Sequence, residues 1–218
     1  STFTLVETLG LGYIGKLVSH SLALNDNMPA PHRQGLSQRE TKKLRPELRG
    51  IDTLEQQATL AETILRAMSL TKYFARVVLL TGHGSQSANN PHAAGLDCGA
   101  CCGQTGEINA RVLAGLLNNP QLRAQLSERD IHIPASTHFL PALHNTTTDE
   151  VVLYDTDLVP HSHSEDIDRL KDSLMQAGEC ARAERAPSLG LTHLVNKPAA
   201  LARSLRIRAN DWSQTRPE

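Results

Sequence analysis

A short aliphatic run constrains the fold of this chain more than any other feature. Residues 76–81 are Arg-Val-Val-Leu-Leu-Thr, and Gly82 follows them. Four consecutive aliphatic side chains leave no polar face, which is typical of a strand buried on both sides in a parallel sheet. Because crossovers between parallel strands usually contain a helix, the run predicts a central strand in an α/β layered fold, with a mainly parallel sheet flanked by helices.

Helical and extended patterns alternate on both sides of this run, as the predicted fold requires. Thr53 and Gln56 form a capping box, and apolar residues then recur at helical spacing. A second capping box, Ser162 with Glu165, precedes a long predicted helix. Further predicted helices span residues 3–24, 107–118 and 120–126, and further predicted strands span residues 137–143 and 150–154.

The charge balance argues against a general nucleic-acid-binding protein. The chain carries 22 Lys and Arg against 23 Asp and Glu, for a formal net charge of −1, whereas such a protein would present a net basic face. No apolar run approaches the roughly 18–20 residues that span a bilayer. We predict a single α/β domain over residues 1–218, with residues 196–218 as a C-terminal extension whose polar tail does not complete a core by itself.

A segment rich in Gly, Asn and Cys, residues 82–106, follows the central run and shows no regular pattern. Long structureless segments inside compact domains are often functional. His83 comes directly after the predicted strand, and Cys98 lies fifteen residues later. Ligands bind beyond the carboxyl ends of strands in open α/β sheets, and imidazole with thiolate favours zinc. The simpler interpretation is that His83 bonds the loop and Cys98 is a small buried hydrophobe.

The cysteines support other hypotheses as well. Cys98 and Cys101 form a Cys-x-x-Cys pair, although a redox pair of this kind is usually found at a helix start. A non-catalytic zinc-stabilised interaction module would use His83, Cys98, Cys101 and Cys180. A Cys-dependent hydrolase would use Cys98 as a nucleophile activated by His83 or His92.

Two further histidine-containing segments have local structural explanations. His161 and His163 resemble a metal-binding pair, but they lie at the start of the long predicted helix, where capping accounts for the sequence. Residues 144–148, His-Asn-Thr-Thr-Thr, follow a predicted strand. Asn and Thr side chains bond the local backbone in such turns.

Several short motifs in one order resemble the DabA family, which comprises inorganic carbon transporter subunits distantly similar to β-carbonic anhydrases. The motifs are Gly82-His83-Gly84-Ser85, Asn89-Asn90-Pro91-His92, Asp97-Cys98-Gly99-Ala100-Cys101, Asn109-Ala110-Arg111, His144-Asn145-Thr146-Thr147-Thr148-Asp149 and the terminal Asp211-Trp212-Ser213 with Arg216-Pro217-Glu218. The resemblance implies a β-carbonic-anhydrase-like fold.

The resemblance also implies that His83 and Cys98 are two of four zinc ligands. The other two ligands of the family are a Cys and an Asp in an upstream Cys-x-Asp motif, which these 218 residues do not contain. We therefore expect the chain to be a central or C-terminal piece of a longer protein. Two ligands do not make a tight tetrahedral site, so the isolated chain is expected to bind zinc weakly or not at all and to be inactive.

For the longer protein, the resemblance implies hydration of CO2 to bicarbonate. Zinc lowers the pKa of a bound water to roughly 7, and the resulting hydroxide attacks CO2. The resemblance further implies a peripheral subunit on the cytoplasmic side of the inner membrane, with a membrane proton-conducting, DabB-like partner subunit.

Overall fold

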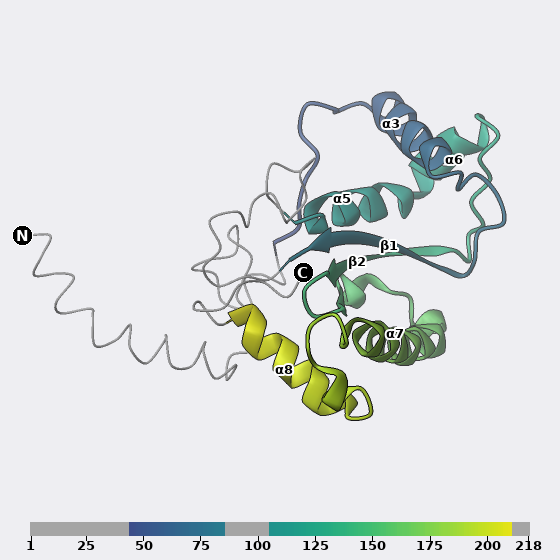
Figure 1. Ribbon diagram of the computed structural model, residues 1–218. Helices are drawn as coiled ribbons and strands as arrows, with labels where there is room; N and C mark the ends of the chain where they lie inside the picture. The colour runs from purple at the N-terminus through teal and green to yellow at the C-terminus, as the bar shows by residue number, and fades with distance from the viewer. Residues whose placement is uncertain (1–43, 86–104, 211–218) are drawn as a thin grey trace, which may run out of the picture.

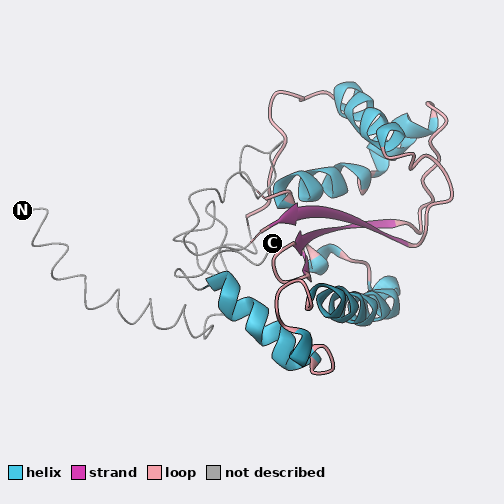
Figure 2. Cartoon of the chain, in the orientation of Figure 1, coloured by secondary structure: helices cyan, strands magenta, loops and turns pink. Residues whose placement is uncertain are grey.

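The computed structural model describes residues 44–85 and 105–210 of the chain. A small sheet lies between two helical layers, with helices α3, α5 and α6 on one face and helices α7 and α8 on the other (Figures 1 and 2). The predicted helix over residues 3–24 and the polar tail lie outside the described residues. The elements are α3 (Leu54–Ala67), β1 (Val77–Gly84), α5 (Glu107–Leu117), α6 (Pro120–Ser127), β2 (His138–Asn145), β3 (Glu150–Leu153), the 3-10 helices η3 (Thr156–Leu158) and η4 (His161–His163), α7 (Ser164–Arg185), the 3-10 helix η5 (Thr192–Leu194) and α8 (Pro198–Asn210).

The described sheet has three strands in the order β1-β2-β3 and is mixed. Strand β1 pairs in parallel with β2, and β2 pairs antiparallel with β3. The α/β class is confirmed. The described sheet is mixed rather than uniformly parallel, because the short turn that joins β2 to β3 permits only an antiparallel pair. The aliphatic run forms β1 as predicted, yet within the described sheet β1 lies at an edge and β2 lies in the centre.

Strand β1 is longer than the sequence predicts. It continues through His83 to Gly84, which pairs in register with Asn145 of β2. The first residues of the predicted loop 82–106 therefore belong to the sheet. Strand β1 extends to Gly84 because β2 offers backbone hydrogen-bonding partners as far as Asn145.

One predicted capping box is confirmed and the other is wrong. In α3, Thr53 and Gln56 cap each other's backbone as predicted. Helix α7 begins at Ser164 with His163 at its N-cap and has no side-chain cap. Ser162 belongs to the 3-10 helix η4 instead, and its hydroxyl pairs with Nδ1 of His163 at 3.0 Å.

Two apolar clusters hold the layers together. The larger one lies between the sheet and the helices α3, α5 and α6. It includes Phe139, whose ring packs edge to face against Phe74 with the ring centroids 6.0 Å apart. The smaller one packs α8 against the end of α7 and the η5 segment through Ala186, Leu191, Leu201 and Leu205. The first half of the predicted C-terminal extension is thus packed, while the extent of the domain stays a prediction.

A buried histidine pair lies at the start of β2. His138 and His163 have ring centroids 6.1 Å apart, and Nε2 of His163 bonds the carbonyl oxygen of Ser136 at 2.8 Å. Both ring nitrogens of His163 are therefore engaged, which argues against its use as a metal ligand. Burial lowers the pKa of His138, and the charges of His163 and Arg123 lower it further.

This lowered pKa makes stability depend on pH. The unfolded chain, with an ordinary histidine pKa of about 6.5, binds the proton more tightly than the folded chain. Stability is therefore complete above that value and decreases on acidification below it, by at most about 1.4 kcal/mol per pH unit from this group. In urea denaturation between pH 7.5 and 5, we expect His138→Gln to reduce the loss of unfolding free energy on acidification. The exposed control His193→Gln should leave that loss unchanged. If the unfolding free energy falls equally with pH in His138→Gln and in the parent chain, His138 is not the source of the pH dependence.

Candidate functional site

The carboxyl ends of β1 and β2 bring two histidines side by side. His83 and His144 are register partners on neighbouring parallel strands, so their side chains project from the same face of the sheet. His83 is exposed, and its imidazole has no bonding partner among the described residues. His144 is half-buried, and its Nε2 lies 3.5 Å from Oδ1 of Asp149.

Close backbone approach fixes both ends of the segment that leaves β1. The amide of Gly106, at the start of α5, donates to the carbonyl oxygen of His83 at 2.8 Å. A Cβ on Gly82 would overlap the backbone of Gly106, and a Cβ on Gly84 would lie 2.8 Å from the Cγ2 of Thr105. Glycine is therefore required at the end of β1 so that two backbones can meet.

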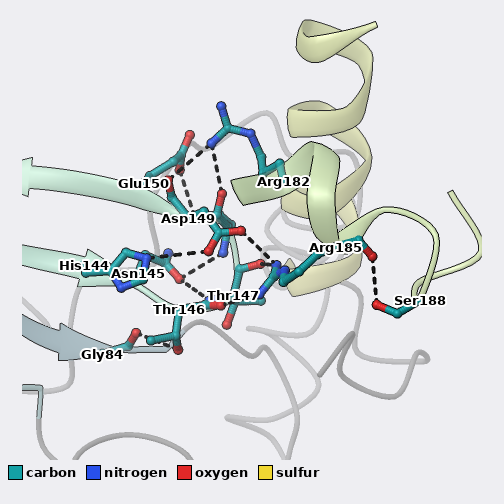
Figure 3. Close-up of polar contacts among 11 residues, drawn as sticks. Gly84, His144, Asn145, Thr146, Thr147, Asp149, Glu150, Arg182, Arg185 and Ser188 are labelled. Carbon is teal, nitrogen blue, oxygen red and sulfur yellow. Dashed lines mark hydrogen bonds and ion pairs between the residues drawn. The ribbon is translucent and has the colours of Figure 1, made fainter. Parts of the chain in front are cut away.

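The turn after β2 is bonded to the end of β1 (Figure 3). Both the amide and the hydroxyl of Thr146 donate to the carbonyl oxygen of Gly84, at 2.8 and 3.1 Å. The Asn145 side chain accepts from the amide of Thr147 at 3.0 Å, as predicted for an Asn turn. Asp149 closes the turn in the left-handed region, with φ 55°, which short Asp side chains tolerate.

Two arginines of α7 hold this turn from the other side, as Figure 3 shows. Arg182 and Arg185 come one helical turn apart and donate to four consecutive carbonyl groups. Such charge-assisted bonds are stronger than neutral ones, so the backbone of the turn is fixed against the helix. The acceptors are the oxygens of Thr146 (2.8 Å) and Thr147 (2.9 Å) for Arg185, and of Thr148 (3.2 Å) and Asp149 (3.3 Å) for Arg182.

The carboxylate of Asp149 connects these arginines to His144. Its Oδ2 lies 3.2 Å from Nη2 of Arg185, and its Oδ1 faces His144. Helix α7 approaches closely enough here that a Cβ on Gly178 would lie 2.5 Å from the Asp149 carbonyl oxygen. The arrangement therefore connects the imidazole of His144, through Asp149, to Arg185 of α7.

A buried ion network anchors the start of α5 beside the same edge. Arg111 bonds both carboxylate oxygens of Asp155, at 2.7 and 2.9 Å, and Oε1 of Glu107 at 3.2 Å. Burial alone would lower the pKa of Arg111, but its bonds to Asp155 and the charges of Asp155 and Glu107 outweigh burial and raise it. Because Glu107 directly follows Gly106, the network holds the point at which the chain re-enters the fold.

The structure places only part of the predicted ligand set. His83 lies at the expected edge, whereas Cys98, Cys101 and His92 lie outside the described residues. Cys180 is exposed on α7. Within residues 44–85 and 105–210, no three His, Cys, Asp or Glu side chains are grouped closely enough to hold a metal ion.

Comparison with known proteins covers the whole chain. A family model described as "Probable inorganic carbon transporter subunit DabA" matches residues 1–218. The chain belongs to the DabA family. The resemblance predicted from the motifs is thereby confirmed, and two of those DabA motifs now lie at the ends of neighbouring strands, around His83 and His144.

Curated DabA relatives match this chain over its full length. The protein named "Probable inorganic carbon transporter subunit DabA" from Vibrio cholerae is 46% identical over 228 residues, covering 100% of this chain and 26% of the relative. The DabA proteins of Chloroflexus aurantiacus (46%, 26% of the relative) and Ectopseudomonas mendocina (48%, 27%) are comparable. The chain therefore spans about a quarter of the length of these relatives, which is consistent with a piece of a longer protein.

No solved structure matches the chain, so the β-carbonic-anhydrase-like layering stays a prediction. Among the helices of the described part, none has the length and apolarity needed to cross a membrane. The sequence pattern did not predict Asp149, Arg182 and Arg185 as a bonded group, because more than 30 positions separate the turn from the arginines of α7. The i, i+3 spacing of the two arginines on one helix face was the available signal.

Proposed function

We propose that this chain supplies His83 and Cys98 as two zinc ligands of an inorganic carbon uptake subunit that hydrates CO2 to bicarbonate. The observation that carries the proposal is the imidazole of His83. It is exposed, lacks a bonding partner among the described residues and lies at the carboxyl end of a parallel strand pair. Ligand sites of open α/β sheets occur at such ends.

The donor types fit zinc. A neutral imidazole and a thiolate are typical zinc ligands, and the remaining ligands would come from the part of the longer DabA polypeptide that lies outside this chain. When bound, zinc would supply Lewis acidity that makes water nucleophilic near neutral pH. Without the remaining ligands, the isolated chain binds zinc weakly and is inactive.

The surrounding residues would position the site. The bonds from Thr146 to Gly84 and from Gly106 to His83 fix the backbone on both sides of the histidine. Asp149, held by Arg185, orients His144 beside it. Such fixed supporting contacts maintain the orientation of ligands at metal sites.

The family name describes a transporter subunit, which implies a partner subunit. We propose that the full protein is peripheral on the cytoplasmic side of the inner membrane and works with a membrane proton-conducting partner. CO2 and bicarbonate are the proposed small-molecule partners.

Metal analysis of variants tests the zinc site. In a full-length DabA polypeptide containing this segment, we expect stoichiometric zinc by mass spectrometry, and at least a tenfold loss in His83→Ala and in Cys98→Ser. Cys180→Ser is the matched control, because Cys180 is exposed on α7, and it should retain zinc. Circular dichroism melting separates metal loss from unfolding.

Three results would contradict the proposal. Full zinc retention in folded His83→Ala would exclude His83 as a ligand. Zinc loss in Cys180→Ser would favour a structural module that uses that cysteine. Tight stoichiometric binding by the isolated chain in a calorimetric titration, lost in Cys98→Ser, would show that the ligand set is complete within these 218 residues.

A further inference from the structure

Strand β1 has a free backbone edge in the described structure. The backbone amide of His138 donates to the Arg76 oxygen, and the amide of Thr146 donates to the Gly84 oxygen, both at 2.8 Å. The backbone N–H and C=O groups of even-numbered residues in β1 therefore point toward β2. The backbone groups of odd-numbered residues point away from β2. His83 is one of these residues, and its oxygen accepts from the amide of Gly106. The remaining outward positions have no backbone partner among the described residues, and they are Val77, Leu79 and Thr81.

The other edges of the sheet are protected. On the free side of β2, the Asn118 side chain donates to the oxygen of Phe139 at 2.8 Å and accepts from its amide at 3.0 Å, as a neighbouring strand would. Pro141, two residues on, has no N–H, and its oxygen accepts from Tyr154 at 2.9 Å. Strand β3 has only four residues. Side-chain caps, proline and short strands prevent pairing at edges.

Within residues 44–85 and 105–210, the edge of β1 has none of these protections. Residues 77–80 are Val-Val-Leu-Leu, without proline or charge. The charged residue that precedes this run, Arg76, bonds Asp166 at 3.0 Å and the Ser162 oxygen at 2.9 Å. A long, aliphatic and unprotected edge is a template for pairing with another strand, so β1 has the character of an internal strand.

We propose that the free edge of β1 pairs with an extended segment from the part of the DabA polypeptide outside these 218 residues. The matched relatives are about four times as long as this chain, which covers 26% of their length, so the polypeptide contains ample sequence for such a strand. A second copy of this chain fits less well. A two-fold symmetric pair would join β1 to itself in antiparallel orientation, whereas a strand that is aliphatic on both faces is typical of parallel sheets.

Site-resolved hydrogen exchange tests the pairing. In the isolated chain, the amides of Val77, Leu79 and Thr81 should exchange quickly, while the inward amides of Val78 and Leu80 are protected and serve as internal controls. In a full-length DabA polypeptide containing this segment, we expect the three outward amides to slow by at least a hundredfold, with little change at the controls.

Two outcomes would overturn the proposal. Fast exchange of the outward amides in the full-length protein would show that no strand covers the edge. Protection that is already present in the isolated chain and rises with its concentration, together with a dimer in light scattering, would assign the edge to a second copy. The readout does not depend on zinc, so it is independent of the proposed metal site.

Discussion

Replacing Arg111 with alanine is expected to lower the free energy of unfolding by about 3–5 kcal/mol. The side chain is 7% exposed and bonds Glu107 and Asp155, which are 1% and 14% exposed. It also donates to the oxygen of Leu44 at 3.1 Å and stacks over the ring of Tyr154. Removing the guanidinium takes away the cation that bonds one buried and one partly buried carboxylate, and breaking such a pair is strongly destabilising.

Urea denaturation followed by circular dichroism measures this effect. The matched control is Arg169→Ala, because the ion pair of Arg169 with Glu165 is exposed, at 74% and 89%, and should contribute less than about 1 kcal/mol. Arg111→Lys should fall between the two, since it keeps the charge but loses the two-point contact with Asp155. A loss below about 1 kcal/mol in Arg111→Ala would show that water solvates the two carboxylates.

Gly82→Ala is expected to cost at least about 2 kcal/mol, because the new Cβ would overlap the backbone of Gly106. No flexible side chain is available to move aside, so either β1 or the start of α5 must shift. The hydrogen bond from Gly106 to His83 spans this contact and should be lost with it.

Gly115→Ala provides the control for this substitution. Gly115 lies in α5 with no atom within 4 Å of an added Cβ, so alanine should stabilise the helix by about 0.5–1 kcal/mol. The same denaturation experiment compares the two variants, and hydrogen exchange at the Gly106 amide reports the local shift. Equal stability of the two variants would contradict the close backbone contact.

Local sequence patterns predicted most elements but not their arrangement. The Thr53 capping box, the aliphatic strand and the helix after Pro120 each depend on neighbouring residues, and all three are confirmed. The Ser162 box failed because a 3-10 turn after Pro160 uses the serine differently. The mixed sheet could not be predicted from single strands, since strand order depends on contacts between distant segments.

The candidate site shows the same division. The position of His83 at a strand end followed from the aliphatic run before it. Its pairing with His144 depends on the register of two strands, and the Arg185–Asp149 contact joins a helix to a turn. Likewise, Arg111 and Asp155 are 44 positions apart in the sequence. Neither residue spacing nor charge pattern determines such long-range pairs, so they required the structure.

The hydrogen bond between Gly106 and His83 has a consequence for how the family can vary. It joins the point where the chain leaves β1 to the point where it enters α5, so both ends of the connection between them are fixed. The entropy cost of such closure grows slowly, by about 0.6 kcal/mol for each doubling of loop length. Changes in the length of this connection should therefore cost little folding free energy and leave His83 and the buried ion network in place.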